Sequence, residues 1–234
     1  MITAIKSNGF TKSLLLFMGA VTLMMLAACD SSGPPQHEES ADNQKITGSQ
    51  RVIVAMGDSL TSGLGVPPAE AYPAQLERLL TERGLDYRVI NAGISGETSS
   101  GARSRVDWVL KLKPDIVILE TGANDGLRGI DPALVEENIE QIIARLKEEQ
   151  ITIVLAGMMM VTNLGKDYID NFNSIYPRLA LRHQVILMPF FLQDVATETS
   201  KNQADGIHPT SEGYRVIAAN LLPLVEEAIK VDSH

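Results

Sequence analysis

Residues 51–60 read RVIVAMGDSL, an apolar run that stops abruptly at a glycine, an aspartate and a serine. The five residues that begin at Val52 are all apolar, and a run of this length is typical of a buried β-strand. Gly57 and Asp58 are residue types that favour turns. The stretch therefore predicts that Ser59 lies where a buried strand breaks into a turn.

Downstream of this run, short strand-like segments alternate with amphipathic helical segments. Strands are predicted at residues 52–56, 87–90, 116–120, 152–156 and 185–188, and helices near residues 72–83, 102–112, 132–150, 168–182 and 211–229. Strands that alternate with helices imply a parallel sheet covered on both faces, which is a three-layer α/β/α sandwich. Asp131 and Pro132 mark the start of the third helix, and Gly84 marks the end of the first.

Turn-forming and polar residues follow the predicted strands at one edge of the sheet. In open α/β sheets, ligands bind beyond the carboxyl ends of the strands. The segments at this edge are Ser59, Asn91 to Gly93, Gly122 to Asp125, and Asp205 to His208. Each segment alone indicates little, because Gly, Asn and Asp are ordinary turn residues. Together they carry the residue types that acyl transfer requires, so we expect an active site at this edge.

Ser59, His208 and Asp205 supply the three groups of a serine-hydrolase triad. A serine hydroxyl is a weak nucleophile until a neighbouring base takes its proton, and a third group is needed to orient the base. His208 is the best-placed of the four histidines, because the others lie in a polar tail, at a predicted helix end and at the chain end. Asp205 lies three residues before His208, so it can share a loop with it and reach its second ring nitrogen.

The chain resembles the GDSL esterases of the SGNH hydrolase superfamily, whose signature residues are Ser, Gly, Asn and His in separate blocks. These blocks occur here in order, at Gly57 to Leu60, at Gly93, at Gly122 to Asp125 and at Asp205 to Pro209. The similarity covers about residues 51 to 230. Residues 91–98 and 124–129 also look like those of periplasmic acyl esterases of this family, which act as thioesterases, lysophospholipases and arylesterases.

The resemblance implies a flavodoxin-like fold and a serine esterase that works through an acyl-enzyme. Ser59 is then the nucleophile, and the backbone N–H groups of Ser59 and Gly93, with the side chain of Asn124, form the oxyanion hole. Ordinary structural explanations remain open for each residue. Ser59 can cap a helix, His208 can be a surface histidine, and Gly93 and Asn124 can be turn residues.

Three aspartates near the predicted site, Asp58, Asp125 and Asp205, also have structural explanations. Asp58 and Asp125 are expected to brace their turns and not to react. Asp205 can alternatively cap the helix that starts near Ser211.

Apolar residues after the strands give a weak prediction of the substrate. Leu127, Met158 and Met160 are candidate residues for binding an acyl chain, because methionine adapts its shape to apolar ligands. Core packing is an equally good explanation of the two methionines. We expect a small-molecule or lipid acyl ester, a lysophospholipid or an acyl thioester. A carbohydrate O-acetyl esterase of the same superfamily is the alternative.

Other classes of protein fit the sequence less well. A non-catalytic binding lipoprotein would need none of the four blocks. An α/β-hydrolase would have a Gly-x-Ser-x-Gly pentapeptide, which this chain lacks. We expect no metal and no cofactor, because the chain has no His-Glu-x-x-His motif and has one histidine near the site.

The N-terminal segment has the composition of an export signal followed by a tether. Residues 1–28 combine basic residues with an apolar stretch too short to span a bilayer comfortably, so they predict a secretory signal. The signal ends in LAAC, which resembles the bacterial lipobox, and Cys29, the single cysteine, is the predicted lipidation site. An uncleaved signal anchor is the alternative. Residues 29–50 are predicted to be a disordered tether, which leaves 51–234 as the hydrolase domain.

Charge and the predicted lipid anchor indicate where the protein acts. The chain has 20 basic and 29 acidic residues and a formal net charge of −9, so a nucleic-acid partner is not expected. The expected location is a bacterial membrane, to which the lipid on Cys29 holds the domain on the periplasmic or external side. Asp30 resembles a residue that retains some lipoproteins in the inner membrane. The sequence leaves the choice of membrane and the oligomeric state open.

Overall fold

A parallel sheet forms the centre of the computed structural model, which describes residues 50–160 and 164–232. Its strands are β1 (Arg51–Gly57), β2 (Tyr87–Gly93), β3 (Ile116–Glu120), β4 (Thr152–Ala156) and β5 (Ile186–Met188). The order across the 5-stranded sheet is β2-β1-β3-β4-β5, and all neighbours are parallel. The predicted sheet is therefore confirmed, and its order is flavodoxin-like.

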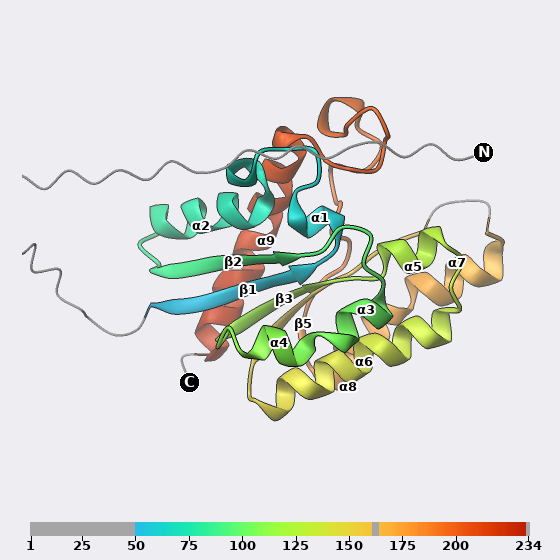
Figure 1. Cartoon of the computed structure of the whole chain (residues 1–234), viewed down its shortest axis with the longest axis horizontal. Coiled ribbons are helices and arrows are strands. Elements are labelled where there is room, and N and C mark those ends of the chain that lie inside the picture. Colours follow the sequence, from blue (N-terminus) through green and yellow to red (C-terminus); the bar gives the residue numbers. More distant parts are fainter. Residues whose placement is uncertain (1–49, 161–163, 233–234) are drawn as a thin grey trace, which may run out of the picture. The chain divides into compact units, whose positions relative to one another are not determined.

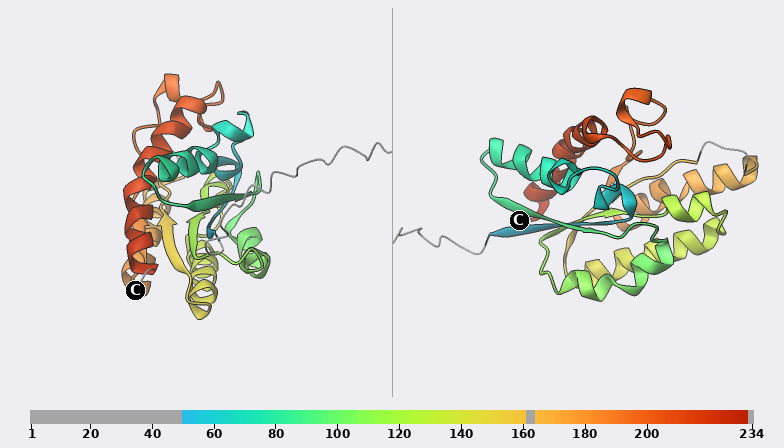
Figure 2. Two further views of the ribbon diagram at one scale, coloured as in Figure 1. Left: turned by 90° about the vertical axis from the view of Figure 1, so that its left-hand side faces the viewer. Right: turned by 45° about the horizontal axis from the view of Figure 1, so that its top comes forward.

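Helices cover both faces of the sheet. In the described part of the chain they are α1 (Ser59–Ser62), α2 (Tyr72–Glu82), α3 (Ser99–Ser104), α4 (Val106–Leu110), α5 (Ala123–Leu127), α6 (Pro132–Glu148), α7 (Lys166–Asn173), α8 (Ile175–His183) and α9 (Ser211–Asp232), with 3-10 helices at Pro68–Glu70 and Thr199–Lys201. Figures 1 and 2 show α2 and α9 against one face and α3, α4, α6 and α8 against the other. This is the predicted three-layer α/β/α sandwich.

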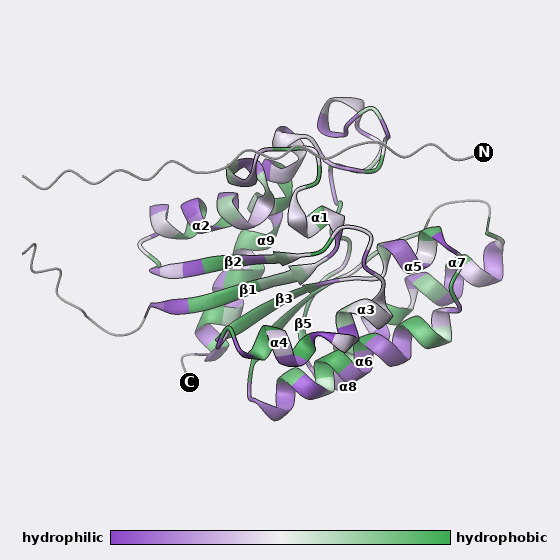
Figure 3. Ribbon diagram, viewed as in Figure 1, coloured by the Kyte–Doolittle hydropathy of each residue, from purple (hydrophilic) through white to green (hydrophobic). Residues whose placement is uncertain are grey.

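The core lies between these layers and consists of aliphatic side chains from both. Figure 3 shows apolar strands between helices that are apolar on one side and polar on the other. In β3, all side chains from Ile116 to Leu119 are fully buried. Helix α6 buries Val135, Ile139 and Ile142 at helical spacing. Each such side chain contributes roughly 1.5–3 kcal/mol when it leaves water, so the sheet is a firm support for the loops at its edge.

Two predicted helices are each divided into two shorter ones. The segment predicted at 102–112 forms α3 and α4, which are separated at Arg105, where φ is −115° and ψ is 9°. The segment predicted at 168–182 forms α7 and α8, which meet at Ser174. Pro177 lies in the first turn of α8 and has no N–H to continue the hydrogen bonds from α7. Hydrophobic periodicity runs through such breaks, so it did not locate them.

Strand β2 is longer than predicted. Asn91, Ala92 and Gly93 were expected to follow the strand, but they pair with β1 up to the partners Gly57 and Gly93. The extra pairs bring Gly93 directly alongside the end of β1.

Other sequence signals fall where they were expected. The Asp131 side chain accepts a hydrogen bond from the Ala133 N–H at 2.9 Å and so caps α6. Gly84 follows α2 with a φ of +74°, which suits glycine. No helix in the described ranges is long and apolar enough to cross a membrane. The predicted signal and Cys29 lie outside the described residues.

Candidate active site

The turn that carries Ser59 is compact because β1 ends in a glycine packed against β3. A Cβ atom at Gly57 would lie 2.4 Å from Glu120 Oε2 and 2.8 Å from the Glu120 carbonyl oxygen, so no larger residue fits there. Asp58 follows as the N-cap of α1, and its Oδ1 accepts a hydrogen bond from the Leu60 N–H at 2.9 Å. Ser59 is the first residue of α1, and Figure 1 shows this helix at the carboxyl end of β1.

The structure brings Ser59, His208 and Asp205 together in one line. His208 Nε2 lies 2.9 Å from Ser59 Oγ, and His208 Nδ1 lies 2.7 Å from Asp205 Oδ2. The imidazole comes from the loop before α9, 149 positions from the serine. Each ring nitrogen therefore faces one of the two partners that the sequence predicted for it.

Asp205 is fixed by its own loop. Its Oδ1 accepts hydrogen bonds from the Ile207 N–H at 2.9 Å and the His208 N–H at 3.0 Å. The hydrogen bond from the His208 ring, together with these two backbone bonds, lowers the pKa of the Asp205 carboxyl below its ordinary value. Asp205 is thus held as an anion against the imidazole. Its hydrogen bonds go to this loop and not to the start of α9, which was the alternative use.

The predicted oxyanion donors Asn124 and Gly93 contact neighbours of Ser59 in the chain. Asn124 is in the first turn of α5, after β3, and its Nδ2 donates to Asp58 Oδ2 at 2.9 Å. Gly93 lies against α1, because a Cβ there would be 2.2 Å from the Ser62 backbone nitrogen. The Gly93 N–H donates to Asn91 Oδ1 at 3.0 Å in this structure. Asn124 and Gly93 both donate a hydrogen bond in this structure, but Asn124 keeps a second amide hydrogen, whereas Gly93 has a single N–H.

Sequence reasoning missed a buried carboxyl group beneath the serine. Glu120, the last residue of β3, is fully buried, and its Oε2 accepts hydrogen bonds from the Asp58 N–H at 3.0 Å and the Thr61 hydroxyl at 2.8 Å. Burial raises the pKa of Glu120 well above its ordinary value, and the nearby Asp58 charge raises it further. The sequence feature that could have indicated this role is a single acidic residue at the end of an otherwise apolar strand.

Asp125 holds the helix that carries Asn124. Its side chain is fully buried and accepts hydrogen bonds from the backbone N–H and the hydroxyl of Ser99, both at 2.7 Å. Asn138 of α6 in turn donates to the Ser99 hydroxyl at 3.0 Å. Helices α3, α5 and α6 are thereby linked behind the site, which fits the bracing role expected for Asp125.

Comparison with known proteins agrees with this geometry. Residues 55–216 match the GDSL-like Lipase/Acylhydrolase family. The chain belongs to this family.

Three curated relatives extend the match over most of the chain. Esterase TesA of Pseudomonas aeruginosa is 35% identical and covers 75% of this chain and 88% of the relative. An arylesterase of Vibrio mimicus is 40% identical (71% and 84% covered). Thioesterase 1/protease 1/lysophospholipase L1 of Escherichia coli strain K12 is 34% identical (77% and 86% covered). This chain is therefore a hydrolase of acyl esters.

A solved structure gives the same result for the fold. The crystal structure of TesA matches with a TM-score of 0.73 and 35% identity, and it covers 76% of this chain and 99% of that chain. The SGNH hydrolase fold that the resemblance implied is thus confirmed.

The predicted acyl-binding residues do not share one environment. Leu127, at the end of α5, is exposed. Met158 is 2% exposed and Met160 is 9% exposed, and both belong to the hydrophobic core. Their burial agrees with core packing, which the sequence left equally open, and a role of these two methionines in binding an acyl chain stays a prediction. Met159, between them, is the exposed one.

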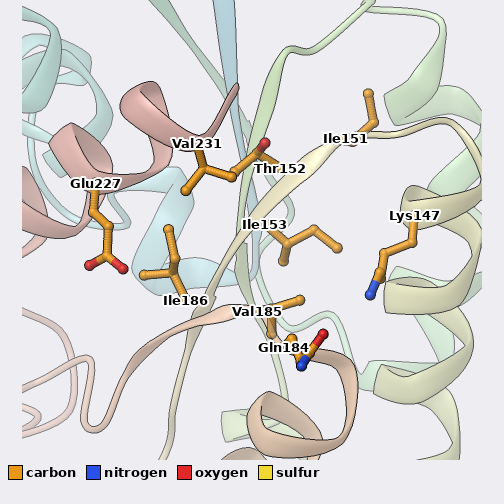
Figure 4. A pocket seen from close by; sticks show the side chains of 9 residues that line it. All are labelled: Lys147, Ile151, Thr152, Ile153, Gln184, Val185, Ile186, Glu227 and Val231. Carbon is orange, nitrogen blue, oxygen red and sulfur yellow. The ribbon is translucent and has the colours of Figure 1, made fainter. Parts of the chain in front are cut away.

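A pocket of about 350 Å³ lies away from the active site of this hydrolase. Figure 4 shows that Thr152 and Ile153, at the start of β4, and Ile186, at the start of β5, line it. Because the strands are parallel and Ser59 follows the end of β1, this pocket is at the opposite edge of the sheet. It is separate from the serine and the histidine.

Proposed function

We propose that Ser59 is the nucleophile of the hydrolase, with His208 as the general base and Asp205 as the group that orients it. The observation that carries this proposal is the pair of contacts of 2.9 Å and 2.7 Å that joins the three side chains. A nucleophile, a base within hydrogen-bond reach and an orienting carboxylate are the parts that serine hydrolysis needs.

The reaction follows from this arrangement. Ser59 Oγ attacks the carbonyl carbon of the ester while His208 Nε2 takes the hydroxyl proton. The tetrahedral intermediate collapses to an acyl-enzyme, and the imidazolium gives its proton to the leaving alcohol or thiol. Water then attacks the acyl carbonyl carbon while His208 takes its proton, and the carboxylic acid leaves as Ser59 regains a proton from the imidazolium. Asp205 remains an anion throughout and stabilises the imidazolium.

The developing oxyanion requires preorganised donors. The Ser59 N–H is at the first position of α1, where the helix supplies no acceptor. Asn124 has two amide hydrogens, and Asp58 fixes the direction of one, so the direction of the other is set as well. The Gly93 N–H becomes the third donor if the oxyanion replaces Asn91 Oδ1 as its acceptor.

The preferred substrates are acyl esters, acyl thioesters and lysophospholipids with an apolar acyl chain. The names of the curated relatives support this range of substrates. A second support is a set of exposed apolar side chains in segments beyond the carboxyl ends of the strands, Leu64, Ile94, Leu127, Met159 and Ile207. Ile207 is next to His208 in the sequence. Apolar groups in these positions suit an acyl chain better than a sugar.

The N-terminal segment makes the hydrolase a lipoprotein in this proposal. Its support is the sequence alone: the predicted signal at 1–28, the lipobox resemblance that ends at Cys29, and the polar tether at 29–50. The lipid holds the catalytic domain, residues 51–234, on the periplasmic or external side of a bacterial membrane.

Fluorophosphonate labelling with intact-mass detection tests the nucleophile. A fluorophosphonate should add one adduct at Ser59 in the wild type and none in Ser59→Ala, whose kcat should fall at least about 10⁴-fold. Ser62→Ala is the matched control, because Ser62 is in the same short helix and its hydroxyl is hydrogen-bonded to the Ser59 carbonyl oxygen and the Ser95 hydroxyl, with no bond to His208 among the described contacts. It should label like the wild type. A labelled Ser59→Ala protein with normal turnover would remove Ser59 from this role.

A substrate series tests the acyl preference. We expect kcat/KM to rise from acetyl to longer 4-nitrophenyl esters and expect activity on acyl-CoA and lysophosphatidylcholine. Acetylated xylan is the comparison substrate. A preference for acetylated xylan would instead identify a carbohydrate O-acetyl esterase.

A further inference from the structure

The buried carboxyl group of Glu120 contacts the residues on both sides of Ser59. One oxygen, Oε2, receives the Asp58 N–H at 3.0 Å and the Thr61 hydroxyl at 2.8 Å. A Cβ atom at residue 57 would lie only 2.4 Å from the same oxygen, so the carboxyl group packs directly against the backbone of Gly57. Residues 57, 58 and 61 are therefore all held by one side chain from the neighbouring strand.

The hydrogen bonds of Glu120 are connected through Asp58 to Asn124, the predicted oxyanion donor. The Asp58 N–H binds Glu120, while its side chain accepts the Leu60 N–H at 2.9 Å and the Asn124 amide at 2.9 Å. A shift of Asp58 would therefore move the first turn of α1 and the Asn124 amide together. Ser59 and Asn124 thus share one support, although they follow different strands.

The second oxygen of Glu120, Oε1, takes no part in the hydrogen bonds to Asp58 and Thr61. Glu120 Oε1 is buried and has no hydrogen-bond partner among the described residues. A full negative charge would be costly in such a place, because buried charges need partners. Burial, followed by the Asp58 charge, raises the pKa of Glu120. Burial also raises the pKa of Asp58, but the two N–H donors to its side chain oppose that shift. The hydrogen bonds therefore favour the negative charge on Asp58 and leave Glu120 as a neutral acceptor.

We propose that Glu120 is a positioning residue for acyl transfer, which fixes the Asp58 to Thr61 turn and, through Asp58, the amide of Asn124. It does not touch the substrate, because its side chain is fully buried. This inference rests on the proposed roles of Ser59 and Asn124. The rate of acyl transfer then depends on Glu120, beyond any contribution of this residue to stability.

The test compares two substitutions of Glu120, one that should leave kcat almost unchanged and one that should lower it. Glu120→Gln keeps a neutral acceptor oxygen for both donors, so its kcat should stay within about threefold of the wild type. Glu120→Leu removes the acceptor, and the displaced turn should lower kcat by about 10- to 100-fold while KM changes less than about threefold, because small misplacements of reacting groups are costly. Rescue by glutamine and a loss confined to kcat are not expected from a stability defect alone.

Leu146→Ala provides the matched control for stability. Leu146 is a fully buried core residue in the last turn of α6, and its truncation lowers the melting temperature without contact to the Ser59 turn. All variants are assayed at a temperature where circular dichroism shows them folded. If Glu120→Leu keeps normal kcat, or if glutamine is as slow as leucine, the proposal is overturned.

Labelling separates this proposal from the proposed function. Each variant is treated with the fluorophosphonate and its labelling rate is measured by intact mass. A wild type that does not label at Ser59 contradicts the proposed nucleophile. A wild type that labels at Ser59, with Glu120→Leu labelling equally fast and turning over equally fast, contradicts only the role of Glu120. Should Glu120→Leu fail to fold, Glu120→Asp withdraws the acceptor by one methylene and should show the same loss confined to kcat.

Discussion

At the scale of single residues, the direction of the Asn124 amide is set by a neighbour and not by its own helix. Asp58 Oδ2 accepts one amide hydrogen at 2.9 Å, which leaves the other to point elsewhere. Side-chain amides rotate freely when exposed, and a free rotor would stabilise an oxyanion poorly. In the proposed mechanism, the Asp58 carboxylate therefore acts by orienting the Asn124 amide.

Asn124→Ala should lower kcat by about 10²- to 10³-fold, because it removes one donor to the oxyanion. KM should change little, since the donor matters most in the transition state. Asn124→Asp is the paired variant. It keeps the size but has no N–H to donate and places a second carboxylate beside Asp58, so it should be at least as slow. Steady-state kinetics on a soluble ester measure both, and a rise in KM alone would assign Asn124 to substrate binding instead.

The residues of the site differ in how well the sequence could predict them. Ser59 stands in a short motif after a strand, and Asp205 and His208 stand in another before the last helix, so their meeting could be predicted, and the structure shows it. Glu120 could not, because its importance depends on which strand lies beside β1. That neighbour is β3, which begins 59 residues after the end of β1 in sequence and pairs with it in register.

At the scale of elements, the contact between β2 and α1 fixes the short helix that begins with Ser59. Strand β2 continues to Gly93, and the absence of a side chain there lets the backbone of Ser62 approach closely. The sequence predicted Gly93 as a backbone donor or a turn residue, and the structure adds a second use for the donor glycine, a close contact with α1. The close contact is the one that the structure shows directly.

Gly93→Ala separates these two uses, because alanine keeps the N–H but adds a Cβ 2.2 Å from the Ser62 nitrogen. Helix α1 must shift, so we expect a loss of about 1–3 kcal/mol in stability and about a 10- to 100-fold loss in kcat. Gly84→Ala is the control. It adds a Cβ in open space at a φ of +74° and should cost about 1–2 kcal/mol without changing kcat. Urea unfolding and steady-state kinetics give both quantities, and equal kcat in the two variants would exclude the helix shift.

Elements were predicted well where hydrophobic runs are long and poorly where short helices follow strands. The strands and α2, α6 and α9 agree with their apolar periodicity. Helices α1 and α5 have 4 and 5 residues, too few for any period to show. These two helices carry Ser59 and Asn124. The parts of the fold that position the chemistry are thus those that periodicity could not predict.

At the scale of the whole fold, the strand order explains why the site lies where it does. In the order β2-β1-β3-β4-β5, the chain leaves β1 toward α2 on one face and leaves β3 toward α6 on the other (Figure 1). The segments after β1 and β3 therefore diverge at the carboxyl edge, which is where open α/β sheets bind their ligands. Ser59 and Asn124 follow these two strands. Predicting the sheet order from sequence depended on the family resemblance, since periodicity gives strands but not their neighbours.

The catalytic domain should be separable from the N-terminal segment that is predicted to anchor it. Residues 50–232 contain the complete described core, so a fragment from residue 50 should fold and hydrolyse a soluble ester with a kcat within about twofold of the full chain. In the full chain, Cys29→Ser should move the protein from the membrane fraction to the soluble fraction and abolish labelling by a radioactive fatty acid. Ser32→Ala, three residues further on, is the control and should stay in the membrane fraction. If the wild type incorporates no labelled fatty acid, the lipid anchor is excluded and an uncleaved signal anchor explains any membrane attachment. The esterase activity of the fragment would be unaffected by that result, because the triad and its supports all lie within the described domain.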